Sequence, residues 1–228
     1  MVGTDPGAAR EHRNHGPGHW ADWLDQKKRS LGAAERDEAA REQWRQAVKA
    51  VDPRRLVFVD ESGTHTALTR LFARAPRGQR AYGQVPRNRG KNTTYVAALT
   101  WEGMQAPWTV EGAMDTAAFV VYVEEVLGPT LQGGQIVVLD NLAVHQAARV
   151  RALIAARGCE LWYLPAYSPD LNPIEEAFSK LKAGLRRLGA RTRLALLDAI
   201  GHVIATITAA DARGWFTHAG CALPAQSP

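Results

Sequence analysis

The sequence predicts an α/β domain in which helices cover both faces of a mixed, five-stranded sheet. Two short runs of consecutive apolar residues, 56–59 and 136–139, are typical of strands buried on both faces. Two further strand-like runs, 93–101 and 104–110, are separated by a two-residue turn and predict an antiparallel hairpin. Strand-like and helical patterns then alternate along the chain, which indicates parallel strands connected by helices.

The other elements follow in order. Asp115 is a good N-cap for a helix that carries apolar residues at 119, 120, 123 and 127. The expected remainder is a helix at 143–156, a strand at 160–164, a loop at 165–172, a helix at 173–188 and a last helix after Thr192. The resulting order, β-β-β-α-β-α-β-α, is that of the ribonuclease H-like fold, which the pattern alone leaves as one of several candidates.

The bulk composition is that of a soluble globular protein. The chain has 228 residues, of which 46% are hydrophobic and 22% charged. No apolar stretch approaches the roughly 20 residues that a membrane span needs, and the first residues lack the apolar core of a signal peptide. We therefore expect a cytoplasmic protein without membrane contact. Cys159 and Cys221 lie far apart, which argues against a disulfide framework or a zinc ribbon.

The chain divides into three parts by composition. Residues 1–18 are rich in Gly, Pro, His and charge and are expected to be a disordered tail. Residues 19–50 are polar with sparse apolar anchors and predict a helical extension. Residues 51–228 carry the buried strands and form the expected catalytic domain.

Positive charge is concentrated in one segment, 74–91, which contains no acid. Its basic residues are Arg74, Arg77, Arg80, Arg87, Arg89 and Lys91. Arginine forks suit phosphate oxygens, and the interleaved Gly and Pro residues leave the backbone open to a close approach. Together with the net charge of +5, this segment favours binding to nucleic acid. The alternative is an ordinary solvated basic loop.

Each of the two buried runs ends in an aspartate, Asp60 and Asp140. A carboxylate at the end of an apolar strand is costly to bury unless a positive group compensates it. Either acid alone could simply cap a turn or a helix. That explanation accounts less well for two strand ends that carry the same chemistry. Asp60 and Asp140 are therefore candidate catalytic residues.

A third acid comes from the helix that begins near residue 173. Asn172 is a good N-cap, and Pro173 suits the first helical position. At about 100° per residue, Glu175 lies at the margin of the apolar stripe, whereas Glu176 lies about 200° from Ile174 and faces water. Helical phase therefore selects Glu175. Its alternative role is to bond back to the backbone of the cap.

Three carboxylates without cysteine ligands suit a hard cation that prefers oxygen ligands. Mg²⁺ is the expected metal, with Mn²⁺ as its substitute. Clusters of this kind typically hold two ions about 4 Å apart. Ser179, Lys182 and Arg186 follow Glu175 on the same flank of the helix. This mostly basic line would bring a phosphodiester backbone alongside the carboxylates.

Three segments resemble the signature blocks of mariner-related insertion-sequence transposases, in the DDE transposase and integrase superfamily. They are LVFVDESG, IVVLDNLAVH and LPAYSPDLNPIEEAFSKLK. The 34 residues between Asp140 and Glu175 are typical of one branch of that group. The block YSPDLNPIE is very specific, and the resemblance covers about residue 50 to the C-terminus.

The resemblance implies a ribonuclease H-like fold and a two-step reaction on DNA. Hydrolysis at a transposon end would release a 3′ hydroxyl, which would then attack target DNA, often at a TA step. Asp60 would be shared by both metals, while Asp140 and Glu175 would each complete one site. The family also implies a homodimer that pairs two DNA ends. Plausible contacts to the site or to DNA are His145, Tyr167, Ser168, Asn172 and Lys182. His145 could equally be a packing or surface residue.

One departure from the family leaves alternatives open. Its members usually carry an N-terminal helix-turn-helix region that recognises terminal repeats. Residues 1–50 are too short and too polar to supply one. The alternative function is a truncated, non-transposing remnant that binds DNA or a full-length transposase. A ribonuclease H-type hydrolase of RNA–DNA hybrids would share the fold and the metals, but the YSPDLNPIE block argues against it.

Overall fold

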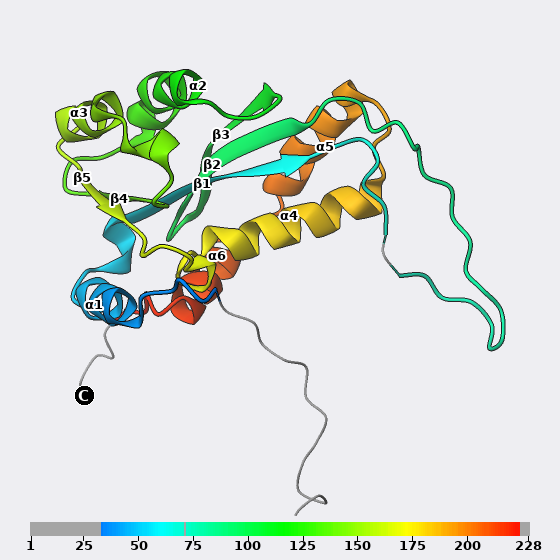
Figure 1. Ribbon diagram of the computed structural model, residues 1–228, viewed down its shortest axis with the longest axis horizontal. Coiled ribbons are helices and arrows are strands. Elements are labelled where there is room, and N and C mark those ends of the chain that lie inside the picture. The colour runs from blue at the N-terminus through cyan, green and yellow to red at the C-terminus, as the bar shows by residue number, and fades with distance from the viewer. Residues whose placement is uncertain (1–32, 71, 224–228) are drawn as a thin grey trace, which may run out of the picture. The chain divides into compact units, whose positions relative to one another are not determined.

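A single five-stranded sheet organises the computed structural model, which describes residues 33–70 and 72–223 (Figure 1). Its spatial order is β3-β2-β1-β4-β5. The strands are β1 (Leu56–Thr64), β2 (Thr93–Thr100), β3 (Gly103–Glu111), β4 (Ile136–Leu139) and β5 (Glu160–Tyr163). The first three pair antiparallel, whereas β4 pairs parallel with both β1 and β5. The predicted mixed sheet and hairpin are therefore confirmed.

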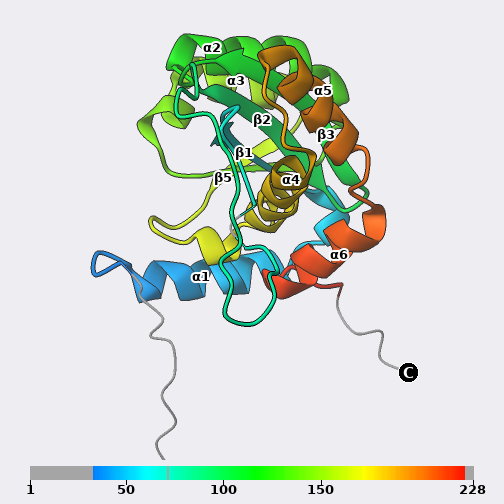
Figure 2. The ribbon, with the colours of Figure 1, turned by 90° about the vertical axis from the view of Figure 1, so that its right-hand side faces the viewer.

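Helices cover both faces of the sheet (Figure 2). The α-helices are α1 (Glu38–Lys49), α2 (Thr116–Val121), α3 (Ala148–Ala156), α4 (Ile174–Leu188), α5 (Arg193–Ile204) and α6 (Ala209–His218). Shorter turns are η2 (Pro53–Arg55), η3 (Tyr122–Leu127, a π-helix), η4 (Gly128–Thr130), η5 (Ala143–Gln146) and η6 (Pro169–Leu171). Side chains from α1, α4, α5 and α6 form one core with one face of the sheet. Side chains from α2, η3 and α3 form a second core with the other face.

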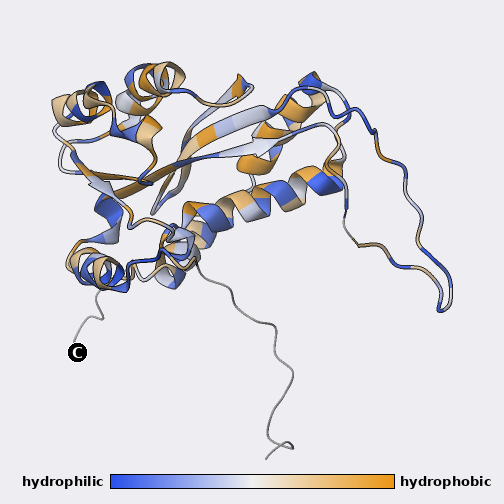
Figure 3. Cartoon of the chain, viewed as in Figure 1, coloured by the Kyte–Doolittle hydropathy of each residue, from blue (hydrophilic) through white to orange (hydrophobic). Residues whose placement is uncertain are grey.

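Alternation along β1 explains the two cores. Leu56 and Phe58 belong to the core under α4, whereas Val57 and Val59 belong to the core under α2 and α3. All four are at most 2% exposed. Figure 3 shows that the first part of β1 is hydrophobic and that its later part is more hydrophilic. The apolar run therefore marks the part of β1 that lies between two layers of helices.

Three expected boundaries were wrong. The strand predicted to end at Asp60 continues to Thr64, because β2 pairs with it over its whole second half. The helix predicted at 143–156 is interrupted at Ala147, where the backbone is extended, and consists of η5 and α3. The helix after Thr192 is not the last, because Thr208 begins α6 with a capping box that includes Asp211.

The extension before the sheet is partly described. The tail expected at 1–18 and the first part of the extension expected at 19–50 lie outside the described residues. Within the described part, Asp37 caps α1, and its Trp44 and Val48 pack into the core. No single helix in the described ranges is long and apolar enough to cross a membrane; only α5 and α6 taken together, bent by 79°, reach that length.

Candidate active site

The three acids selected from the sequence line one pocket of about 320 Å³. Asp60 comes from the middle of β1, Asp140 follows β4 directly, and Glu175 lies in the first turn of α4. The loop between β5 and α4 supplies most of the remaining wall. Other lining residues are Asn141, Leu142, Leu164, Pro165, Ala166, Tyr167, Ser168, Pro169 and Asn172.

The register of the sheet brings the first two acids together. β1 and β4 run parallel, with Phe58 opposite Val138. The same register carried two residues further aligns Asp60 with Asp140. The two carboxylates therefore lie side by side at the carboxyl end of β4, the kind of sheet edge where ligands commonly bind, although β1 itself continues to Thr64.

Asp60 is a buried carboxylate that, among the described residues, is held by amide groups alone. It is 9% exposed. Asn172 Nδ2 donates to its Oδ2 at 2.8 Å, and the backbone N–H of Glu61 donates to its Oδ1 at 2.7 Å. Burial raises the pKa of Asp60 to about 7, and the neighbouring charges of Glu175 and Asp140 act in the same direction. The site therefore favours a cation beside this carboxylate.

Asp140 is held by His145, which is fully buried in η5. His145 Nδ1 lies 2.5 Å from Asp140 Oδ1, and its Nε2 lies 3.1 Å from Glu61 Oε2. Burial alone would lower the pKa of His145, but the hydrogen bonds and charges of Asp140 and Glu61 raise it to about 9. The backbone N–H of Leu142 also donates to Asp140 Oδ1, at 3.0 Å. These contacts fix the orientation of the Asp140 carboxylate.

Glu61 was not singled out from the sequence. It follows Asp60 directly and is partly buried, with 18% of its side chain exposed. The sequence feature that could have pointed to Glu61 is its place inside the LVFVDESG block. Its contact with residue 145 cannot be predicted from either segment alone. His145, for which packing was an equal alternative, does both: it contacts Asp140, and its ring packs 4.3 Å from that of Phe119.

Glu175 and Glu176 have different surroundings, but the prediction that Glu176 is the one facing water was wrong, because Glu175 is exposed and Glu176 is half-buried. Glu175 lines the pocket with Asp60 and Asp140. Glu176 points to α6 instead, where its Oε1 contacts His218 Nδ1, so it is half-buried rather than facing water. The expected N-cap role of Asn172 was wrong: α4 has no side-chain cap, and the Asn172 side chain is bound to Asp60.

The donor set fits metal ions shared by pairs of carboxylates. Within the described residues, no three His, Cys, Asp or Glu side chains converge on a single point. Two ions that share Asp60 need only two carboxylates each, which is compatible with this arrangement. Asn172 Oδ1, which is buried, accepts no hydrogen bond from the described residues and adds an oxygen donor beside Asp60. All these donors are hard oxygens, which Mg²⁺ and Mn²⁺ prefer.

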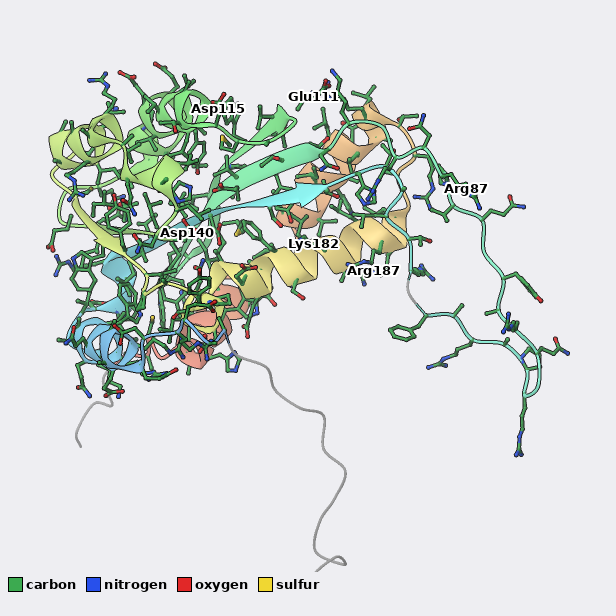
Figure 4. All side chains as sticks on the ribbon, viewed as in Figure 1. Arg87, Glu111, Asp115, Asp140, Lys182 and Arg187 are labelled. Carbon is green, nitrogen blue, oxygen red and sulfur yellow. The ribbon has the colours of Figure 1, made fainter. Side chains whose placement is uncertain are left out.

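The predicted DNA-binding residues fall into two groups. Lys182 and Arg186 lie on α4, about two and three turns beyond Glu175. Figure 4 labels Lys182 on this helix. Arg74, Arg77, Arg80, Arg87, Arg89 and Lys91 lie in the loop between β1 and β2, where they are exposed and outside the pocket. At the base of this loop, Lys91 and Arg193 both pair with Glu111. The structure therefore does not bring the loop's arginines to the carboxylates.

The fold and the pocket define a class: nucleases and strand-transferases of the ribonuclease H-like type, with acids brought together by neighbouring strands. A family model for the DDE superfamily endonucleases matches residues 55–195, more than half of the chain. The chain therefore belongs to the DDE superfamily endonucleases. No curated protein sequence matches it closely enough to count as a relative.

Solved structures with the same fold include several of the mariner Mos1 transposase. A pre-cleavage Mos1 transpososome matches with a TM-score of 0.67 and 17% identity, over 87% of this chain and 64% of that chain. The Mos1 strand transfer complex matches with a TM-score of 0.64 and 18% identity, over 88% and 64%. The isolated Mos1 catalytic domain matches with a TM-score of 0.55 and 15% identity, over 80% and 86%. The chain thus spans a little under two thirds of the Mos1 chains in these complexes, and the ribonuclease H-like fold expected from the strand order is confirmed.

Proposed function

We propose that this chain is the catalytic domain of a DNA transposase in which Asp60, Asp140 and Glu175 carry out the chemistry. The observation that carries the proposal is the convergence of these three acids in one pocket of a DDE-family domain. Asp60 in particular is buried with amide groups as its donors in the part of the chain that the structure describes, and the negative charges of Glu175 and Asp140 disfavour its own. A pocket of this kind is suited to cations and to the phosphodiesters that cations recruit.

The proposed cofactor is Mg²⁺, with Mn²⁺ as its substitute, bound as two ions. Asp60 would contribute to both ions, while Asp140 and Glu175 would each complete one. When bound, such ions activate the attacking oxygen and stabilise the leaving oxygen of a phosphodiester. Solved Mos1 paired-end complexes with Mg and with Mn support this choice.

The chain's own residues prepare the carboxylates for that role. Asn172 keeps Asp60 in one orientation from the α4 side. His145 does the same for Asp140 and is itself held by Glu61. Because these partners are buried, the ligand oxygens need little reorganisation before the reaction begins.

The proposed substrate is DNA, cut by water and then joined through the new end. In the first step, the water oxygen bonds to phosphorus, the bond to the 3′ oxygen breaks, and a 3′ hydroxyl is released. In the second, this hydroxyl attacks a phosphodiester of target DNA and displaces its 3′ oxygen. The basic loop 74–91, Lys182 and Arg186 would bind backbone phosphates. A homodimer that pairs two ends is also proposed, in line with the Mos1 paired-end complex with left transposon end.

A nicking assay on supercoiled DNA tests the proposal, with Mg²⁺ or Mn²⁺ as the only divalent ion. We expect nicking by the wild type and background rates for Asp140→Asn and Glu175→Gln. Glu176→Gln is the matched control, because it removes the neighbouring acid of the same helix without touching the pocket. Equal nicking by wild type and Asp140→Asn would refute the assignment. DNA binding without nicking by the wild type would favour the remnant that only binds DNA.

A further inference from the structure

Arg41 of α1 is a buried arginine in a helix that precedes the residues matched by the family model. It is only 2% exposed. Its guanidinium donates two parallel hydrogen bonds to the Asp170 carboxylate, from Nη1 to Oδ1 at 3.0 Å and from Nη2 to Oδ2 at 2.7 Å. Its Nε donates to Glu38 Oε2 at 3.2 Å. Every nitrogen of this guanidinium is therefore engaged.

A second arginine from the same segment reinforces the contact. Arg36 Nη2 donates to Asp170 Oδ1 at 2.8 Å, and Arg36 Nε donates to the backbone oxygen of Tyr167 at 3.2 Å. Two arginines thus converge on one carboxylate. They lower the pKa of Asp170, through the hydrogen bond from Arg41 first and the charges of both arginines after it. Half of the Asp170 side chain is exposed, so the pair defines geometry more than it adds stability.

The carboxylate that the arginines hold belongs to the loop that forms one wall of the pocket, although Asp170 itself does not line the pocket. The loop around it contributes six of the pocket-lining residues, namely Pro165, Ala166, Tyr167, Ser168, Pro169 and Asn172. Asp170 lies within the η6 turn, and Asn172 caps that turn two residues later. Because Asn172 also donates to Asp60, the path from Arg41 to the buried catalytic carboxylate consists of one ion pair, one short turn and one hydrogen bond.

The loop has a conformation that needs support from outside. Tyr167 has φ of +56°, in the left-handed region that costs a residue with a side chain roughly 1–2 kcal/mol. The Arg36 hydrogen bond is made to the carbonyl of this same residue. Strained backbone persists only where surrounding contacts determine it, and here one such contact is the hydrogen bond from Arg36, which lies just before α1.

We propose that Arg41, assisted by Arg36, is a positioning residue of the active site. The arginines keep loop 165–172 in the conformation that places Asn172 against Asp60, so α1 is part of the catalytic apparatus although it precedes the sheet. This inference rests on the proposed metal-dependent function of the pocket. It assigns the N-terminal extension a role in the chemistry that is separate from any binding of DNA.

The test compares Arg41→Lys and Asp170→Asn with a matched control, Arg45→Lys, one turn further along α1. Lysine keeps the charge of Arg41 but lacks the fork, and asparagine keeps the shape of Asp170. Within residues 33–70 and 72–223, the partner of Arg45 is Glu42 of its own helix. We expect Arg41→Lys and Asp170→Asn to raise the Mn²⁺ concentration for half-maximal nicking by about tenfold, the low end of the effect of residues that orient metal ligands. The control should match the wild type.

Two further measurements separate positioning from stability. The double variant Arg41→Lys/Asp170→Asn should be no worse than the more affected single variant, because both changes remove the same contact. Hydrogen exchange of the peptide that covers 165–172 should accelerate in both single variants and not in Arg45→Lys. A lowered melting temperature with an unchanged Mn²⁺ requirement, measured well below that temperature, would overturn the proposal.

The exchange measurement also keeps this inference distinct from the proposed function. It needs no catalysis, so it reports on the loop even in a protein that does not nick DNA. The wild type could fail to nick DNA while Arg41→Lys still shows faster exchange in loop 165–172. That result would refute the proposed function and still support the contact of Arg41 with Asp170 as the support of the loop. A rate of hydrogen exchange in loop 165–172 that is the same in Arg41→Lys as in the wild type would refute the positioning role of Arg41.

Discussion

Gly184 lies where α4, the helix that carries Glu175, packs against α5. It is buried, and a Cβ built on it would lie 2.6 Å from Cγ1 and 2.8 Å from Cγ2 of Val203. Two effects of Gly184→Ala oppose each other. Alanine gains about 1 kcal/mol of helix propensity over glycine. Overpacking a core typically costs about 1–3 kcal/mol.

The steric cost should dominate, because the obstructing atoms cannot move aside. Val203 is 4% exposed and β-branched, and in a helix such a side chain has one strongly preferred rotamer. We therefore place the steric cost in the upper part of its range, at about 2–3 kcal/mol, so that Gly184→Ala lowers the free energy of unfolding by about 1–2 kcal/mol after the propensity gain. For a domain of this size, that corresponds to a fall of about 2–8 °C in melting temperature.

Denaturant and thermal unfolding measure this effect, with Gly201→Ala as the matched control. Gly201 is a helical glycine of α5 whose added Cβ would meet nothing within 4 Å. Its substitution should stabilise the protein by up to about 1 kcal/mol through propensity alone. Val203→Ala should relieve part of the loss in a double variant with Gly184→Ala. A Gly184→Ala protein as stable as the wild type would refute the reasoning.

Three other predictions concern the site, the C-terminal helix and the basic loop. His145→Asn keeps a donor near Asp140, whereas His145→Gln keeps one near Glu61. The Mn²⁺ concentration for half-maximal nicking should therefore rise more in His145→Gln than in His145→Asn. Equal rises would contradict the role of the contact with Asp140. Hydrogen bonds from Lys180 and Thr208 lower the pKa of Asp211 to about 2, so its contribution to stability is present above about pH 4 and lost as the pH falls through 2. The stability difference between wild type and Asp211→Asn should shrink over that window in acid unfolding titrations, and a constant difference would contradict it. Arg87→Ala/Arg89→Ala should reduce the salt dependence of DNA binding, log K against log salt, by about 2 if both contact phosphates; an unchanged slope would place both outside the interface.

The sequence was sufficient wherever one local pattern determined the outcome. Buried runs located the two strands that carry Asp60 and Asp140, because such runs depend only on local burial and backbone periodicity. Helical phase selected Glu175, which lines the pocket, but it wrongly placed Glu176 in water, because phase carries no information about the contact with His218 of α6. Asn172 shows the limit of this reasoning. Its sequence position favours a helix cap, but the buried Asp60 carboxylate requires a hydrogen-bond donor. The Asn172 side chain points to Asp60 because it supplies that donor.

The contacts that hold the site could not be predicted, because each one joins distant parts of the chain. Arg41 and Asp170 are separated by 129 positions, and His145 and Glu61 by 84. Neither segment of either pair contains a signal for its partner. The extent of β1 was hidden for a related reason: its second half is polar, and backbone pairing with β2 rather than hydrophobic burial makes it a strand.

The location of the pocket follows from the unequal lengths of the central strands. β1 pairs with β2 from Phe58 to Thr64, but its pairing with β4 ends at Phe58. Beyond that point β1 has lost its parallel neighbour, and the chain leaving β4 turns away through Asp140 and the η5 turn. The opened edge is where Asp60 meets Asp140, with the α4 N-terminus closing the third side. A longer β4 would fill this gap with backbone pairing, so the early end of that strand is what makes room for the carboxylates.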